Sequence, residues 1–122
     1  MMAMEGRGTV AADDRLYRLY EELARGDFTS SRELFAETYR HHVPGLGIEY
    51  SGRDQAIEGL RAVFDQLQLR IKADGVTRHG PFLVGYTTSR SRLHVSPVCG
   101  IHVFRVEGNA IVEGWVLSPP PG

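Results

Sequence analysis

The chemistry that this sequence could support centres on its five histidines, and His102 is the most informative of them. It lies between Ile101 and Val103 in an apolar segment typical of a strand, so it shares one face with Phe104. An imidazole has an ordinary pKa of about 6.5, so it can accept a proton or donate a hydrogen bond to a carbonyl or enolate oxygen near neutral pH. His102 is therefore a candidate acid or base if that face lines a pocket, and a structural histidine if it does not.

Two further histidines, His41 and His42, are adjacent in an extended segment. Their side chains should point to opposite sides of the chain, one toward the interior and one toward solvent. The inward imidazole could face His102 across a cavity, with one ring acting as base and the other as acid. A histidine that hydrogen-bonds a helix end is the alternative interpretation.

Neither a metal site nor a cofactor site is expected. No two histidines have the spacing of a helical zinc motif, and Cys99 is the only cysteine, so we interpret it as a small apolar packing residue. The sequence has no glycine-rich dinucleotide motif and no Walker-type loop. We therefore expect a site that works without a metal or a cofactor.

Helical spacing of apolar residues predicts three helices in the first half of the chain. The expected helix starts are, in order, Asp13 or Asp14, Ser30, and Ser51 or Asp54. On the first helix, Tyr20 lies on the apolar face. It is interpreted either as a core residue or as a hydroxyl that could donate a hydrogen bond to an oxyanion.

Alternating apolar segments separated by turn residues predict strands in the second half. The expected strands are Leu69–Ala73, Phe82–Thr88, Leu93–Val98 continued by Ile101–Val106, and Ile111–Leu117. We interpret Gly100 as a bulge and Gly108 as part of a hairpin turn. Helices followed by an antiparallel meander indicate one α+β domain at 13–117, between an N-terminal arm at 1–12 and a proline-rich tail at 118–122.

The composition limits the expected partners and location. The chain has 14 basic and 15 acidic residues, and the basic residues are scattered along it, so neither nucleic acid nor a membrane surface is an expected partner. No apolar stretch approaches the roughly 20 residues that span a bilayer. Residues 1–12 lack the apolar core of a signal peptide. A soluble cytoplasmic protein is the expectation.

Six segments carry a family resemblance, and their order and spacing are more specific than any one of them. They are Leu23–Asp27, Leu34–Ala36, Tyr39–Pro44, Tyr50–Ile57, Gly100–Val106 and Gly108–Trp115. Together they resemble the SnoaL-like family of the nuclear transport factor 2-like, or ketosteroid isomerase-like, superfamily, over about residues 13–117. The resemblance implies a cone-shaped fold in which a curved, mostly antiparallel sheet and three N-terminal helices enclose a deep, mostly apolar pocket.

The chain departs from the family pattern at the usual acid and base positions. The histidine and aspartate that flank the last-strand tryptophan in many SnoaL-like cyclases correspond to Gly114 and Val116. The base position of isomerase-like members corresponds to Val43. The resemblance instead places His102 on the penultimate strand and favours His42 as the inward member of the histidine pair.

The family includes polyketide cyclases, isomerases, epoxide hydrolases, dehydratases and binding modules, so the fold alone does not settle the function. We expect a cofactor-independent enzyme that cyclises or isomerises an apolar, oxygenated, polyketide-like small molecule, with His102 and His42 as the acid–base pair and Tyr20 as support. The expected pocket residues are Trp115, Phe104, Tyr50, Tyr86, Phe64 and His94. The alternatives are an epoxide hydrolase or dehydratase, for which Glu113 is the available carboxylate, and a non-catalytic binding or dimerisation module. The resemblance also implies a homodimer formed through a face of the sheet.

Overall fold

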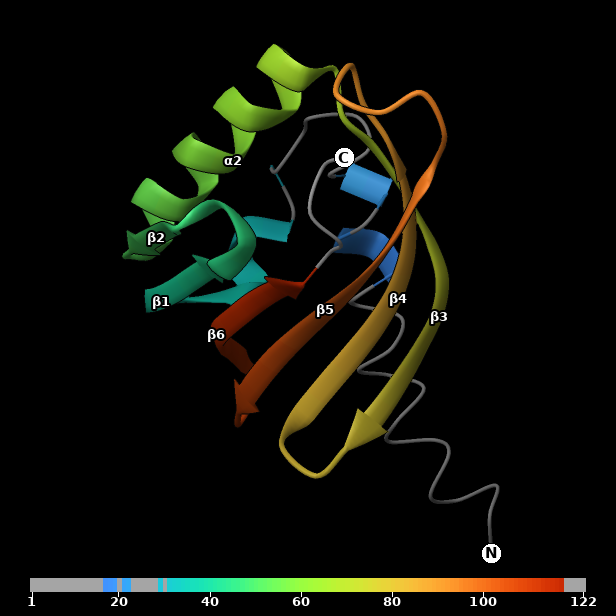
Figure 1. Cartoon of the computed structure of the whole chain (residues 1–122). Helices are drawn as coiled ribbons and strands as arrows, with labels where there is room; N and C mark the ends of the chain where they lie inside the picture. Colours follow the sequence, from blue (N-terminus) through green and yellow to red (C-terminus); the bar gives the residue numbers. More distant parts are fainter. Residues whose placement is uncertain (1–16, 20, 23–28, 30, 118–122) are drawn as a thin grey trace, which may run out of the picture.

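One strongly curved sheet organises the structure, a computed structural model that describes residues 17–19, 21–22, 29 and 31–117. Within these residues the sheet has six strands in the order β2-β1-β6-β5-β4-β3. Their bounds are β1 Phe35–Val43, β2 Ile48–Ser51, β3 Arg70–His79, β4 Phe82–Arg90, β5 Val98–Glu107 and β6 Ala110–Leu117. β1 and β6 are parallel and all other neighbouring strands are antiparallel, so the sheet is mixed (Figure 1).

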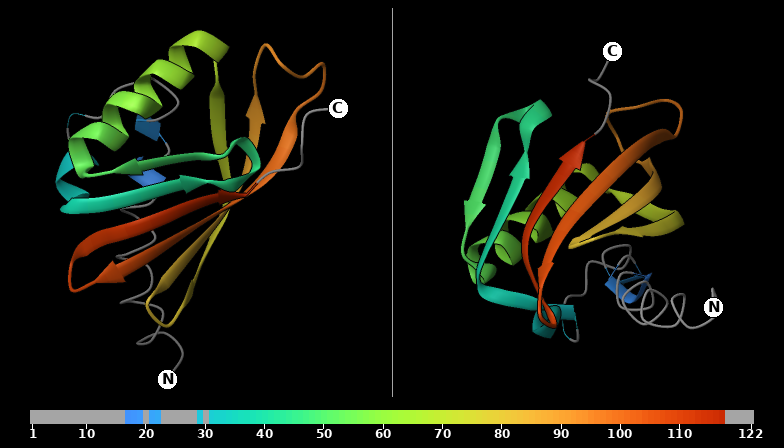
Figure 2. Two further views of the ribbon diagram at one scale, coloured as in Figure 1. Left: turned by 60° about the vertical axis from the view of Figure 1, so that its left-hand side comes forward. Right: turned by 90° about the horizontal axis from the view of Figure 1, so that it is seen from below.

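The helix α2 (Arg53–Leu67) lies on the inner side of the curved sheet (Figure 2). We call the sheet face turned toward α2 the inner face and the opposite one the outer face. The spacing of Ile57 and Phe64 puts both side chains on the buried stripe of the helix. This confirms the third expected helix, but its N-cap is Gly52 and no side chain caps it.

The other two expected helices differ from the prediction. The second is only a 3₁₀ turn, η1 (Ser31–Leu34), because Phe35 already begins β1 and is buried there beside Ile111 of β6. Of the first, residues 17–19 and 21–22 are helical, and the rest lies outside the described residues. The described part of the chain thus contains one substantial helix, not three.

The predicted strands are found near their expected positions, but some of their bounds differ. β3 continues to His79, well past its predicted end, and a loop replaces the strand expected at 93–97. Gly100 is not a bulge, since it pairs with Thr87 in regular register. The predicted turn at Gly108 is confirmed, since this residue, at φ 62°, begins the two-residue connection between β5 and β6. Gly47, at φ 66°, ends the 3₁₀ turn η2 (Pro44–Leu46).

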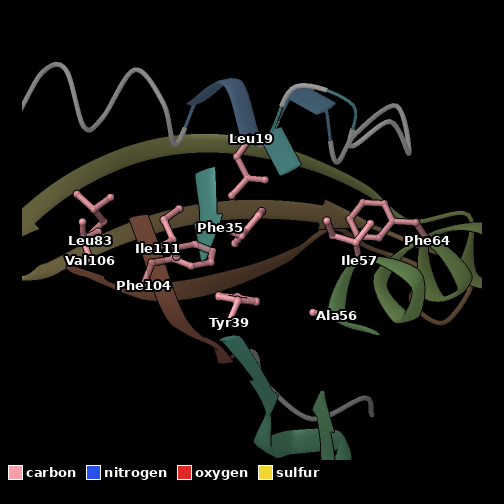
Figure 3. Close-up of a cluster of buried hydrophobic side chains, with 10 residues drawn as sticks. All are labelled: Leu19, Phe35, Tyr39, Ala56, Ile57, Phe64, Leu83, Phe104, Val106 and Ile111. Carbon is pink, nitrogen blue, oxygen red and sulfur yellow. The ribbon is translucent and has the colours of Figure 1, made fainter. Parts of the chain in front are cut away.

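The core lies between α2, the helical residue Leu19 and the inner face of the sheet (Figure 3). Its fully or nearly fully buried members are Leu19, Phe35, Tyr39, Ala56, Ile57, Phe64, Leu83, Phe104, Val106 and Ile111. Along β5, the alternation of Phe104 and Val106 with exposed or half-buried neighbours fixes which face is buried. Among the described residues, no helix combines the length and the apolar character needed to cross a bilayer.

Candidate functional site

A cavity of about 180 Å³ lies between α2 and the inner face of the sheet. Most of the described residues that line it are apolar, and none of them is an Asp, Glu, Lys or Arg. The polar side chains in the lining are those of His41, Tyr50, Thr87, Ser89, Ser91, His94 and His102. The ionisable groups at this wall are therefore imidazoles and one phenol.

His102 lines the cavity from β5 and is 5% exposed. Its ring meets the ring of Phe104 edge to face, with the centroids 6.2 Å apart. The predicted sharing of one face by His102 and Phe104 is therefore confirmed. Burial, and after it the charge of His41, lowers the pKa of His102 from 6.5 to about 4, so the ring is neutral at pH 7.

His41 lines the cavity from β1 and is 3% exposed. Its Nδ1 lies 2.7 Å from the hydroxyl of Tyr39, and its ring stacks on Tyr50 with the centroids 6.3 Å apart. Its Nε2 is buried and has no hydrogen-bond partner within the described residues. Burial, and after it the charge of His42, lowers the pKa of His41 to about 4, so this ring too is neutral at pH 7.

Gly114 of β6 makes room for this arrangement. It is buried between β1 and β5, where it pairs with His41 and Phe104. A Cβ at this position would overlap the hydroxyl of Tyr39 and lie 2.9 Å from the Phe104 ring. The space of a side chain at this position is thus taken by the phenol that contacts His41.

We expect Gly114→Ala to lower the free energy of unfolding by about 1–3 kcal/mol, because the new methyl group overpacks a filled site. It should also separate Tyr39 from His41 and shift the His41 ring signals in NMR spectra. Urea unfolding measures the first effect. Gly45→Ala is the matched control, since a Cβ there meets nothing within 4 Å. Equal stability of the two variants would contradict this account of Gly114.

His42 lies on the outer face, which corrects the sequence-based interpretation. Its Nδ1 is 2.9 Å from Glu49 and its Nε2 is 2.7 Å from Glu113, while the ring stacks on Trp115 with the centroids 5.5 Å apart. The histidine that shares the cavity wall with His102 is His41. The expected pairing of His42 with His102 across the cavity is therefore wrong.

Glu113 joins three strands on the outer face. It accepts hydrogen bonds from His42 and, at 3.1 Å, from Arg105, and Arg40 lies 3.9 Å away. Burial alone would raise the pKa of Glu113, but the hydrogen bonds from His42 and Arg105 and the charge of Arg40 outweigh it and lower the pKa below its ordinary value of 4.5. Glu113 is thus held as a carboxylate away from the cavity.

Glu113→Gln should destabilise the fold at pH 7 by about 1–3 kcal/mol, because a partly buried, charge-assisted network loses its acceptor. The pKa of Glu113 is lowered in the folded state, so its contribution is present above the ordinary value of 4.5 and is lost as the pH falls through the folded-state pKa. The difference in the free energy of unfolding between wild type and variant should therefore become smaller at acidic pH. Urea unfolding at pH 7 and pH 3.5 tests this, with the exposed Glu58→Gln as control; a gap that persists unchanged in acid would refute the assignment.

The remaining expected pocket residues divide between the two faces. Phe104, Tyr50, Phe64 and His94 line the cavity. Trp115 and Tyr86 do not, because strand alternation turns them to the outer face, where Trp115 packs on His42 and Tyr86 is 43% exposed. Tyr20 lies outside the described residues.

The sequence contained a signal for His41 that the interpretation missed. His41 alternates with Tyr39 and Val43, whereas His42 shares its face with Arg40. The alternation of apolar residues along β1 therefore predicts that the side chain of His41 points inward. Among the described residues, no group of three or more histidine, cysteine, aspartate or glutamate side chains is placed to bind a metal ion.

Comparisons with known proteins agree with this geometry. Several solved structures share the fold. An NTF2-like protein of unknown function from Mesorhizobium loti has a TM-score of 0.76 at 19% identity, covering 91% of this chain and 93% of that chain. A candidate SnoaL-like polyketide cyclase from Jannaschia sp. CCS1 has a TM-score of 0.75 at 15% identity, covering 90% and 86%. A candidate ketosteroid isomerase from Kribbella flavida has a TM-score of 0.74 at 16% identity, covering 93% and 85%.

At these identities the structural likeness establishes the fold alone. A search of curated proteins gives no match. The family assignment comes from the sequence, in which residues 16–114 match the model of the SnoaL-like domain. The chain therefore belongs to the SnoaL-like domain family, and it has the fold of the NTF2-like and ketosteroid isomerase-like structures named above.

Proposed function

We propose that this protein is a cofactor-independent enzyme that cyclises or isomerises an apolar, oxygenated, polyketide-like small molecule by proton transfer in the cavity. The observation that carries the proposal is the presence of two buried, neutral imidazoles, His41 and His102, in the wall of a largely apolar cavity. Such a cavity desolvates a substrate and fixes its conformation, and a few polar groups then act on the charge that develops.

The contact between Tyr39 and His41 supports a donor role for His41 and a base role for His102. If its phenol donates to Nδ1 of His41, the ring carries its proton on Nε2 and can donate a hydrogen bond to a carbonyl oxygen as it becomes an enolate. His102 is then the base. A neutral donor of this kind needs no proton from solvent, and its strength grows with the negative charge on the oxygen.

The lowered basicity of these rings constrains the substrate. A base with a pKa of about 4 removes a proton efficiently only from an acidic carbon, because proton transfer to it is otherwise strongly uphill. The carbon between two carbonyl groups in a polyketide-like chain meets this requirement. A cavity of about 180 Å³ suits a body of one or two rings, since an engineered apolar cavity of ~150 Å³ holds benzene.

Hydrolysis of an epoxide is less well supported. It would rely on a carboxylate in the cavity, and the expected candidate, Glu113, hydrogen-bonds His42 and Arg105 on the outer face. The non-catalytic binding module makes a different prediction about the same imidazoles: ligand would bind without proton transfer.

Titration of the five histidine rings by NMR, with and without 2-naphthol as a two-ring oxygenated probe, tests the proposal. His41 and His102 should titrate near pH 4, and both should respond to 2-naphthol. His79 on the far end of β3 is exposed and serves as the internal control. A protein in which 2-naphthol perturbs neither buried ring, or in which neither ring shows a lowered pKa, would rule out the proposed site.

A further inference from the structure

Two cations near the start of β3 and two near the end of β4 come together where these strands pair. Arg70 and Lys72 project from the start of β3, Arg90 from the end of β4, and Arg92 from the loop that follows. We call these four residues the basic patch. All four are exposed, and no described carboxylate forms an ion pair with any of them.

The arrangement is unfavourable for the isolated chain. Arg70 and Arg90 are directly opposite each other in the β3–β4 ladder. Like charges placed opposite one another destabilise a sheet. Asp74, two residues after Lys72 on the same strand, accepts a hydrogen bond from the hydroxyl of Thr88. The patch therefore keeps a local excess of positive charge on a chain whose net charge is −1.

The basic patch lies on a chain segment that also forms part of the cavity wall. Ser89 and Ser91 line the cavity, and Arg90 lies between them on the exposed side. The backbone N–H of Arg92 donates to the carbonyl of Leu67, at 2.9 Å, and so fastens the loop to the end of α2 (Figure 1). Leu93 of this loop lines the cavity and is also exposed, so the cavity opens at the loop and a partner that binds the patch would stand beside that opening.

The same loop exposes apolar side chains. Leu93 lines the cavity and is 54% exposed, and Val95 is fully exposed. Apolar contacts flanked by charged groups are typical of protein–protein interfaces. None of the four cations lines the cavity described above, whereas a site for a small anion is normally concave.

We propose that the basic patch, with Leu93 and Val95, docks an acidic protein at the cavity mouth. Resting on the proposed function, this partner would deliver the cavity's substrate or take up its product. Opposite charge would steer the encounter, and the apolar loop residues would make the short-range contact. A nucleic acid is a poorer fit, because the chain as a whole is slightly acidic.

The test follows backbone amide signals by NMR during titration with poly-L-glutamate, as the acidic polypeptide probe. Amides of 70–72 and 90–95 should shift, and Arg70→Gln/Arg90→Gln should weaken binding at least fivefold. Arg18→Gln/Arg32→Gln removes the same charge from exposed positions elsewhere and should change binding less than twofold. Equal weakening by the two double variants would overturn the proposal, since it would mean a response to net charge alone.

Competing occupants are tested at the same amides with inorganic phosphate, duplex DNA and phosphatidylglycerol vesicles. Tighter binding of any of these than of poly-L-glutamate would overturn the proposal in favour of that ligand. Binding of 2-naphthol to His41 and His102 is recorded separately and should be unchanged in Arg70→Gln/Arg90→Gln. If 2-naphthol fails to bind while poly-L-glutamate still does, the cavity function fails and the docking surface stands.

Discussion

Acidifying the protein from pH 6.5 to pH 4 is expected to lower its free energy of unfolding by several kcal/mol. In the folded state the pKa values of His41 and His102 are both lowered from 6.5 to about 4, in each case mainly by burial. Between these two pH values the unfolded chain binds protons that the folded chain excludes, so stability falls as the pH falls. The difference corresponds to roughly 3 kcal/mol for each ring at pH 4.

The sign and the pH window make this prediction specific. The stabilising contribution is fully present above pH 6.5, declines below it, and levels off below about pH 4, where the folded rings also protonate. Glu113 acts in a lower window, below 4.5, so the two effects separate on the pH axis.

Urea unfolding between pH 4 and pH 7 measures the effect. His102→Gln, which cannot titrate, should show a shallower decline than wild type, whereas the exposed His79→Gln should follow wild type. A flat wild-type curve over this range, or parallel curves for wild type and His102→Gln, would show that the buried rings are not held neutral.

Much of the fold could be predicted from the sequence because local patterns decide it. The apolar stripe through Ile57 and Phe64 can be buried on only one side of a helix. Turn residues such as Gly108 fix where strands begin and end. The prediction was wrong where tertiary pairing outweighed local signals: Phe35 continues a helical pattern in sequence, but in the structure it is buried in β1 beside β6.

The site was predictable only in part. On β5, alternation placed His102 on one face with Phe104, but Ile101 and Val103 make the other face apolar too, so the pattern left open which face is buried. On β1 the alternation of His41 with Tyr39 and Val43 favoured His41, whereas the family resemblance favoured His42, and the structure buries both, at 3% and 7% exposed. The carboxylates that hold His42 come from β2 and β6, which lie far apart in sequence, and no local pattern reveals them.

The basic patch could not be predicted from local sequence patterns either. Its four residues are scattered in the sequence and meet only because β3 pairs with β4 in a register that sets Arg70 against Arg90. Composition shows only that the basic residues are scattered along the chain. It does not show which of them the strand pairing brings together on one surface. Pairing register, rather than residue type, is the information that the sequence pattern lacked.

His102→Gln is expected to lower turnover about 10²- to 10⁴-fold, the usual contribution of a positioned acid or base. The assay uses 2-acetyl-1-tetralone, which has one carbon between two carbonyl groups. NMR measures the rate at which the protein catalyses deuterium exchange at that carbon. In wild type the exchange rate should rise with pH through the free-protein pKa of about 4 and then stay level to pH 7. His41→Asn should also slow exchange, because the developing enolate loses its proposed donor.

A substitution of the neighbouring His42 is the control that distinguishes a loss of catalysis from a loss of stability. His42→Gln disturbs the contacts with Glu49 and Glu113 on the outer face, so it should lower stability while leaving the rate per folded molecule at pH 7 unchanged. Because His41 and His42 are adjacent on one strand, any general loosening of β1 would affect both variants alike. Equal loss in His41→Asn and His42→Gln would therefore contradict the assignment, whereas loss confined to His41→Asn and His102→Gln is what two imidazoles acting on one bound enolate require.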